Sequence, residues 1–151
     1  MKNVIVLQHI KIEDPGYIKD LMIDDGINLT TIELDEGESI PSNLNKFDAM
    51  FCMGGPMDTW MEKDYPWLIE EKKAINEFVV FLKKPYLGFC LGCQLLGEVT
   101  GGKVVKSENP EIGMLDINFS ENKKNDLLFS KFPEKIKSLQ WHSYEVQELE
   151  K

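Results

Sequence analysis

A cysteine between two closely spaced glycines restricts the fold of this chain more than any other feature. It stands in the run Gly88-Phe89-Cys90-Leu91-Gly92, after an apolar segment and before a segment with apolar residues at helical spacing. A sharp turn that leads from a strand into a helix and carries a nucleophile accepts only small residues on either side. The sequence therefore predicts a strand that ends just before Cys90 and a helix that begins directly after it.

This predicted turn also determines the chemistry of the cysteine. The N–H groups and the positive dipole end at a helix N-terminus favour a thiolate over a thiol. The backbone N–H of Leu91 would point towards any oxyanion that forms. Most free cysteines are small buried apolar residues, so the two glycines and the strand-to-helix position are what favour a nucleophile here. We expect Cys90 to be that nucleophile and its pKa to be lowered.

The apolar patterning predicts strands that alternate with helices. Short apolar or alternating runs predict strands at 4–7, 29–34, 47–53 and 85–89, and helical spacing predicts helices at 17–22, 66–82 and from residue 90 onwards. Such alternation is typical of a mostly parallel sheet with helices on both faces. Further strands are expected at 104–105, 114–119 and 136–142, without clear helices between them, as an antiparallel extension. A length of 151 residues fits one domain.

Composition excludes some classes of function. The formal net charge of −9 argues against nucleic-acid binding, because phosphate recognition needs a basic face. No apolar segment is long enough for a membrane span, and the N-terminal run does not have the pattern of a secretory signal. Three cysteines, an odd number, indicate reduced thiols in a cytoplasmic protein.

Three segments together resemble one protein family. The run from Gly88 to Gly97, closed by Gly101-Gly102, resembles the nucleophile motif of class I glutamine amidotransferases, which have a flavodoxin-like fold. Met53-Gly54-Gly55-Pro56 resembles their glycine-rich loop, and Glu111-Ile112-Gly113 resembles a later segment. The chain as a whole looks most like the stand-alone proteins related to the glutaminase domain of GMP synthase.

The resemblance implies roles for individual residues. The oxyanion donors would be the N–H groups of Gly55 and Leu91. Gly54 and Gln94 would contact the bound glutamine. Within Trp141-His142-Ser143-Tyr144, which resembles a segment that lines the glutamine pocket, Ser143 and Tyr144 would contact the substrate mainly through their backbone.

The base that should assist the cysteine is harder to find. The family's His-x-Glu element does not occur in the sequence, whose two histidines are His9 and His142. We expect a single domain over 1–151 that lacks the family's C-terminal strands and catalytic histidine. His142 with Glu145 is the alternative base pair, while His9 is expected to be a surface or strand-end residue without a catalytic role.

Several functions remain open at this level. The first is hydrolysis of the glutamine side-chain amide through a γ-glutamyl thioester, with the ammonia passed to a synthetase subunit. The second is hydrolysis of a γ-glutamyl peptide or conjugate on the same scaffold, and the third is a binding module that has lost its base. A redox pair of Cys90 and Cys93 is disfavoured because Cys-x-x-Cys alone is a weak motif, and Cys93 is expected to pack in the core. No metal or cofactor is expected, since no second Cys/His pair completes four zinc ligands.

Overall fold

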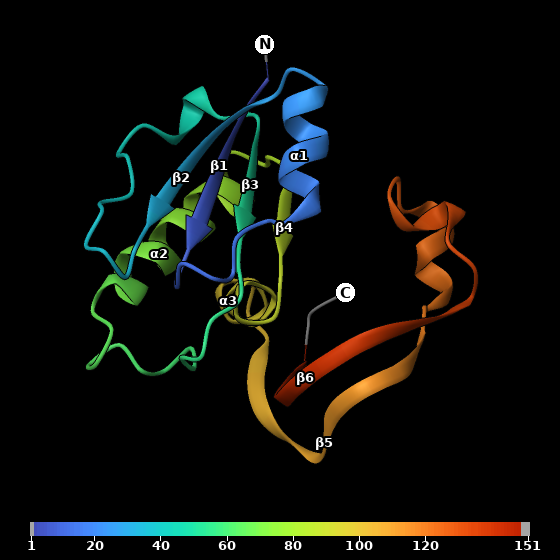
Figure 1. Cartoon of the computed structure of the whole chain (residues 1–151). Helices are drawn as coiled ribbons and strands as arrows, with labels where there is room; N and C mark the ends of the chain where they lie inside the picture. Colours follow the sequence, from blue (N-terminus) through green and yellow to red (C-terminus); the bar gives the residue numbers. More distant parts are fainter. Residues whose placement is uncertain (1, 149–151) are drawn as a thin grey trace. The chain divides into compact units, whose positions relative to one another are not determined.

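The computed structural model describes residues 2–148, which divide into two compact units. Of these residues, the first unit comprises 2–104 together with 146–148, and the second comprises Val105–Glu145. The first unit holds a four-stranded sheet in the order β2-β1-β3-β4, and every neighbouring pair in it is parallel (Figure 1). Its strands are β1 (Asn3–Gln8), β2 (Asn28–Glu33), β3 (Ala49–Cys52) and β4 (Tyr86–Gly88).

Helices cover both faces of this sheet, as predicted. They are α1 (Tyr17–Asp24), α2 (Trp67–Asn76), which continues into a π-helical turn (Glu77–Phe81), and α3 (Leu91–Val99), with a short 3-10 helix at Leu44–Lys46. Side chains alternate between the faces of a strand, and β1 is apolar on both. Val4 and Val6 pack in the cluster that includes residues of α1, whereas Ile5 and Leu7 pack in the cluster that includes residues of α2 and α3. Burial on both faces explains the continuous apolar run of the first strand.

The second unit is built mainly from two long strands, β5 (Lys103–Asn118) and β6 (Lys135–Gln147), which pair with each other. Their ion pairs and hydrogen bonds join residues in opposite order along the two strands, so the pair is antiparallel: Lys103 with Glu148, Ser107 with Glu145, Glu111 with His142, and Asp116 with Lys135. Two 3-10 helices, Glu121–Asn125 and Phe129–Lys131, lie between the strands.

Two predictions about this region were wrong. The segments at 104–105 and 114–119 belong to one continuous strand, and the pair β5-β6 is a sheet of its own rather than an extension of the parallel sheet. The polar stretch around Pro110 resembles a turn in the sequence, yet contacts with β6 continue on both sides of it. Pairing with β6 therefore overrides the preference of the residues around Pro110 for a turn.

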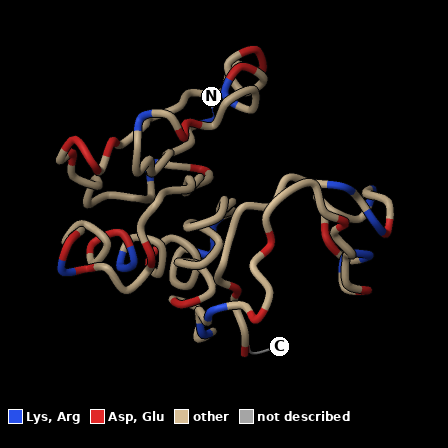
Figure 2. Tube along the Cα trace, turned by 60° about the horizontal axis from the view of Figure 1, so that its bottom comes forward, with Lys and Arg blue, Asp and Glu red and all other residues tan. Residues whose placement is uncertain are grey.

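The basic residues do not gather in one part of the described chain. Figure 2 shows the basic residues scattered along the trace among the more numerous acidic ones, in both units. Within the described part of the chain, no helix has the length and apolar character that crossing a membrane would require.

Candidate active site

The predicted strand-to-helix turn is present at Cys90. β4 ends at Gly88, α3 begins at Leu91, and Cys90 between them has φ 48° and ψ −104°. A positive φ is unusual for a residue with a side chain and is maintained only where the surrounding structure enforces it. The Cys90 side chain is exposed. The structure therefore confirms the predicted sharp turn from a strand into a helix at Cys90.

The glycines of the elbow leave no room for side chains. A Cβ atom on Gly88 would lie 2.5 Å from the carbonyl carbon of Gly92, and one on Gly92 would collide with the carbonyl oxygen of Cys52. The Gly92 N–H donates hydrogen bonds to Phe89 O at 2.9 Å and to Met53 O at 3.2 Å. These contacts fix the start of α3 against the end of β3.

The electrostatics of Cys90 differ from the expectation. Partial burial raises the pKa of its thiol, a hydrogen bond from the Leu91 N–H lowers it, and the nearby negative charge of Glu13 raises it further. The net direction is upwards, so the prediction of a lowered pKa was wrong. The helix start does favour the thiolate, but desolvation and a neighbouring carboxylate outweigh it.

This balance gives a first testable prediction. Glu13→Gln removes a negative charge that disfavours the thiolate, so the pKa of Cys90 should fall and its alkylation by iodoacetamide at pH 7 should accelerate. Exposed charge pairs contribute about 0.2–1 kcal/mol, so we expect the alkylation rate of Cys90 to increase by up to about fivefold. Mass-spectrometric mapping of the alkylated cysteine gives the rate. Glu36→Gln, beyond the edge strand β2, is the matched control, and an equal increase in both variants would contradict the role of Glu13.

The glycine-rich loop lies beside the cysteine. It follows β3, and Met53 N–H is hydrogen-bonded to Leu7 O at 2.9 Å. A Cβ atom on Gly54 would lie 3.6 Å from Cys90 Cβ and would collide with the Glu13 carboxylate. Among residues 2–148, the Gly55 N–H has no hydrogen-bond acceptor, and the Leu91 N–H has no main-chain acceptor. Where the loop and the elbow meet, the Gly55 N–H is thus without an acceptor among the described residues, and the Leu91 N–H donates to the Cys90 sulfur.

The remaining predicted substrate residues fall in different parts of the fold. Gln94 lies in the first turn of α3, where its N–H donates to Cys90 O at 3.1 Å. Ser143 and Tyr144 lie on β6 within the second unit. Their role in binding stays a prediction.

The alternative base pair has other partners in the second unit. The two ring nitrogens of His142 lie 3.1 Å from Tyr144 O and 3.0 Å from Gln140 Oε1, with Glu111 Oε2 also 3.0 Å from Nε2. Glu145 accepts a hydrogen bond from Ser107 Oγ at 3.2 Å. Both nitrogens of the His142 ring therefore face oxygen atoms.

Cys93 also differs from the expectation. It was predicted to pack in the core, but it is an exposed residue of α3 with a free thiol. The buried face of the same helix is formed instead by residues that include Leu91 and Leu95. The described cysteines Cys52, Cys90 and Cys93 are all free.

The environment of His9 differs from the predicted one more than that of any other residue named above. His9 lies at the end of β1, as a strand-end residue should, but it is fully buried rather than on the surface. Its Nδ1 lies 2.8 Å from Gly54 O, its Nε2 lies 2.8 Å from Glu71 Oε1, and its ring stacks on Trp67 with centroids 5.3 Å apart. The available signal was its place at the carboxyl end of a central parallel strand, where sites of open α/β sheets form.

A buried polar cluster surrounds this histidine. The thiol of Cys52 donates to Glu71 Oε1 at 3.2 Å, and one candidate ligand atom from each of His9, Cys52 and Glu71 lies within 4.8 Å of the other two. Burial raises the pKa of Cys52 well above its usual value. Without a bound metal the cysteine is thus a protonated hydrogen-bond donor to Glu71.

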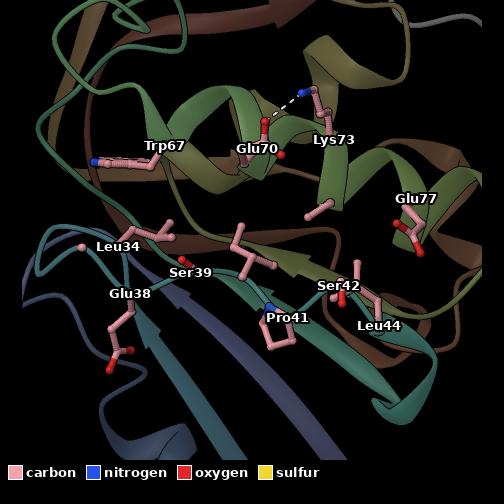
Figure 3. Close-up of a pocket in the computed structure, with 13 residues that line it drawn as sticks. Leu34, Glu38, Ser39, Pro41, Ser42, Leu44, Trp67, Glu70, Lys73 and Glu77 are labelled. Carbon is pink, nitrogen blue, oxygen red and sulfur yellow. Dashed lines mark hydrogen bonds and ion pairs between the residues drawn. The ribbon is translucent and has the colours of Figure 1, made fainter.

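A cavity of about 480 Å³ opens elsewhere, between α2 and the segment that follows β2 (Figure 3). Trp67, Ala74 and Leu34 line it, and an ion pair of 2.7 Å joins Lys73 and Glu70 at its edge. Neither the elbow nor the glycine-rich loop contributes to its lining. We therefore do not assign this cavity to the site at Cys90.

Comparison with known proteins identifies relatives over most of the chain. The family described as glutamine amidotransferase class-I matches residues 17–151. The glutamine amidotransferase-like protein YfeJ of Salmonella typhimurium is 30% identical over 138 residues, which are 89% of this chain and 57% of that protein. A subunit of the glutamine-hydrolyzing GMP synthase of Sulfurisphaera tokodaii is 29% identical over 140 residues, which are 91% of this chain and 63% of that protein.

Solved structures give the same result for the fold. A crystal structure of a glutamine amidotransferase from Thermotoga maritima superposes with a TM-score of 0.90 at 28% identity, covering 98% of this chain and 63% of that one. The chain thus spans somewhat less than two thirds of the length of these relatives.

Proposed function

Since the chain belongs to the class I glutamine amidotransferase family, we propose that it is a glutamine-hydrolysing domain whose nucleophile is Cys90. The observation that supports this proposal is the exposed Cys90 thiol on a strand-to-helix turn, with the Leu91 N–H hydrogen-bonded to its sulfur and the glycine-rich loop beside it; the N–H groups of Gly55 and Leu91 are the proposed oxyanion donors. One donor comes from the loop after β3 and the other from the start of α3. A carbonyl carbon placed over the sulfur would direct its oxygen between them.

The proposed reaction follows from these groups. The Cys90 sulfur attacks the side-chain amide carbon of glutamine, and the carbonyl electron pair moves onto oxygen, where the two N–H groups stabilise it. The tetrahedral intermediate collapses, the C–N bond breaks, and the leaving amine takes up the proton that the Cys90 thiol gave up, so that ammonia departs. Water then attacks the γ-glutamyl thioester, the C–S bond breaks, glutamate is released, and one proton of the water restores the thiol.

Relatives suggest where the ammonia goes. Several are named as one subunit of a glutamine-hydrolyzing GMP synthase, a name that implies a second, synthetase subunit. We propose that glutamine is the substrate and that a synthetase subunit receives the ammonia. Hydrolysis of a γ-glutamyl peptide or conjugate uses the same nucleophile and donors, and is the second candidate.

The proposal is tested by acylation of the cysteine. γ-Glutamyl 4-nitrophenyl ester should release one equivalent of nitrophenolate in a rapid phase, and mass spectrometry should place the γ-glutamyl group on Cys90. Excess glutamine should slow this phase, whereas a γ-glutamyl peptide that slows it more would favour the second candidate. Cys90→Ser should abolish the rapid phase.

The matched control lies one helical turn away. Cys93→Ser should leave acylation of Cys90 nearly unchanged, because Cys93 is exposed and the proposed reaction does not use its thiol. Acylation of Cys93 instead of Cys90, or ready formation of a disulfide between them, would contradict the proposal and favour the redox hypothesis. Tight binding of glutamine without any acylation would favour a binding module.

A further inference from the structure

A buried histidine holds the peptide that presents one of the two proposed oxyanion donors. His9 Nδ1 lies 2.8 Å from the carbonyl oxygen of Gly54. A carbonyl oxygen can only accept, so Nδ1 carries the hydrogen and donates it. This bond joins the end of β1 to the loop after β3, 45 residues further along the chain.

The direction of that carbonyl determines the direction of the donor. The Gly54 carbonyl and the Gly55 N–H belong to the same peptide unit, which is planar and trans, so they point to opposite sides. With the carbonyl held towards the buried His9, the Gly55 N–H is turned away from the interior. Gly54 itself lies against Cys90, since a Cβ added to it would be 3.6 Å from Cys90 Cβ.

The histidine is in turn fixed on its other sides. Its Nε2 lies 2.8 Å from Glu71 Oε1 on α2, and Trp67, from the first turn of the same helix, stacks on its ring with an interplanar angle of 18°. Cys52 donates to the same Glu71 oxygen. His9 and Glu71 have no exposed surface, so water does not compete for these hydrogen bonds. A peptide with glycine on both sides is otherwise free to rotate.

We infer that His9 is a positioning residue for the oxyanion hole: its Nδ1–H, oriented by Glu71 and Trp67, holds the Gly54–Gly55 peptide so that the Gly55 N–H faces the carbonyl oxygen of the substrate. The inference rests on the proposed function, because it assigns Gly55 as an oxyanion donor. His9 does not contact the substrate. It acts through the peptide, and no other described side chain is hydrogen-bonded to the Gly54 carbonyl.

Two substitutions separate this hydrogen bond from the rest of the histidine's contacts. In His9→Asn the side-chain amide nitrogen can occupy the place of Nδ1 and still donate to Gly54 O. In His9→Gln the longer amide reaches the place of Nε2, which keeps the contact with Glu71 and loses the donor to Gly54. Both variants lose the stacked ring, so they are matched in that respect.

Acylation and alkylation of Cys90 should respond differently in these variants. Acylation by γ-glutamyl 4-nitrophenyl ester passes through an oxyanion, whereas alkylation by iodoacetamide does not. We expect His9→Gln to slow acylation by at least about tenfold. Complete loss of one oxyanion donor costs about 10²–10³-fold, and the effect should be smaller here because the Gly55 N–H is still present and is only less well oriented. His9→Asn should stay within about threefold of the parent chain, and both variants should be alkylated at the parent rate.

The outcomes are distinct. Equal acylation rates in the two variants, with the parent chain reactive, would overturn the inference and leave the proposed function standing. A parent chain that is alkylated but never acylated at Cys90 would overturn both. Loss of acylation on treatment of the parent chain with EDTA would instead assign His9, Cys52 and Glu71 as metal ligands and would also overturn the inference.

A measurement on the unaltered chain covers the case in which a variant does not fold. In a sample with ¹⁵N-labelled histidine, NMR should show a proton on Nδ1 of His9 from pH 5 to pH 9, in slow exchange with water. An unprotonated Nδ1 in this range would exclude the hydrogen bond to Gly54 and overturn the inference.

Discussion

Replacement of His9 by leucine is expected to lower the free energy of unfolding by about 3–5 kcal/mol, the range observed when one partner of a buried charged pair is removed. The His9 and Glu71 side chains are fully buried, and Glu71 Oε2 already lacks a hydrogen-bond partner among residues 2–148. Without His9, the thiol of Cys52 is the one hydrogen-bond donor that the described part of the chain still offers to the Glu71 carboxylate. Urea denaturation at neutral pH measures the loss.

A double variant tests whether the loss comes from the unpaired charge of Glu71. Glu71→Leu in the His9→Leu background removes that charge, so the double variant should be more stable than His9→Leu alone. Coupling between contacting residues of this kind is typically about 0.5–3 kcal/mol. Simple additivity of the two single changes would contradict a paired role for them.

The pair of His9 and Glu71 should also make the stability of the fold depend on pH, and the direction of this dependence follows from the pKa of His9. Burial lowers the pKa of His9, but the hydrogen bond to Glu71, the charge of Glu71 and the Gly54 carbonyl together raise it above the ordinary value of 6.5. A group whose pKa is higher in the folded than in the unfolded chain stabilises the fold fully at any pH below its pKa in the unfolded chain. This stabilisation is lost as the pH rises through the pKa of the group in the folded chain. The stability difference between the parent chain and the double variant should therefore shrink as the pH is raised above about 6.5.

Local patterns were sufficient to predict most of the parallel sheet. β1 has a continuous apolar run, and α2 has apolar residues at helical spacing. In both elements the spacing of apolar residues within the element itself indicates its type and its buried face. The elbow at Cys90 was predictable for a related reason. Its glycines satisfy steric demands set by neighbours in the sequence, such as the approach of Gly88 to Gly92.

Features that depend on distant partners were not predictable in this way. β5 continues through Pro110 because β6 pairs with it, and the sequence around Pro110 contains no sign of that partner. His9 is buried because Glu71, 62 residues away, meets its ring nitrogen. The raised pKa of Cys90 likewise comes first from burial by the folded chain and then in part from the charge of Glu13, which reaches the site from another loop.

The last prediction concerns the general base. We expect Cys90 to be acylated by an activated γ-glutamyl ester but to release ammonia from glutamine very slowly, because general-base assistance is worth about 10²–10⁴-fold. Of the two histidines, His9 holds the Gly54 carbonyl, and both ring nitrogens of His142 face oxygen atoms of Tyr144, Gln140 and Glu111. A histidine must free one nitrogen before it can accept a thiol proton.

The matched variants are His142→Ala and His142→Gln, and two rates are measured in each. Both should leave the acylation of Cys90 and the slow ammonia release within about twofold of the parent chain, since neither rate is expected to use the 10²–10⁴-fold assistance of a base. Rapid ammonia release that both variants abolish would contradict this expectation. The catalytic set would then be Cys90, His142 and Glu145, and the hydrogen bonds that now engage His142 would have to open during the reaction, since an engaged nitrogen cannot take the proton from the thiol.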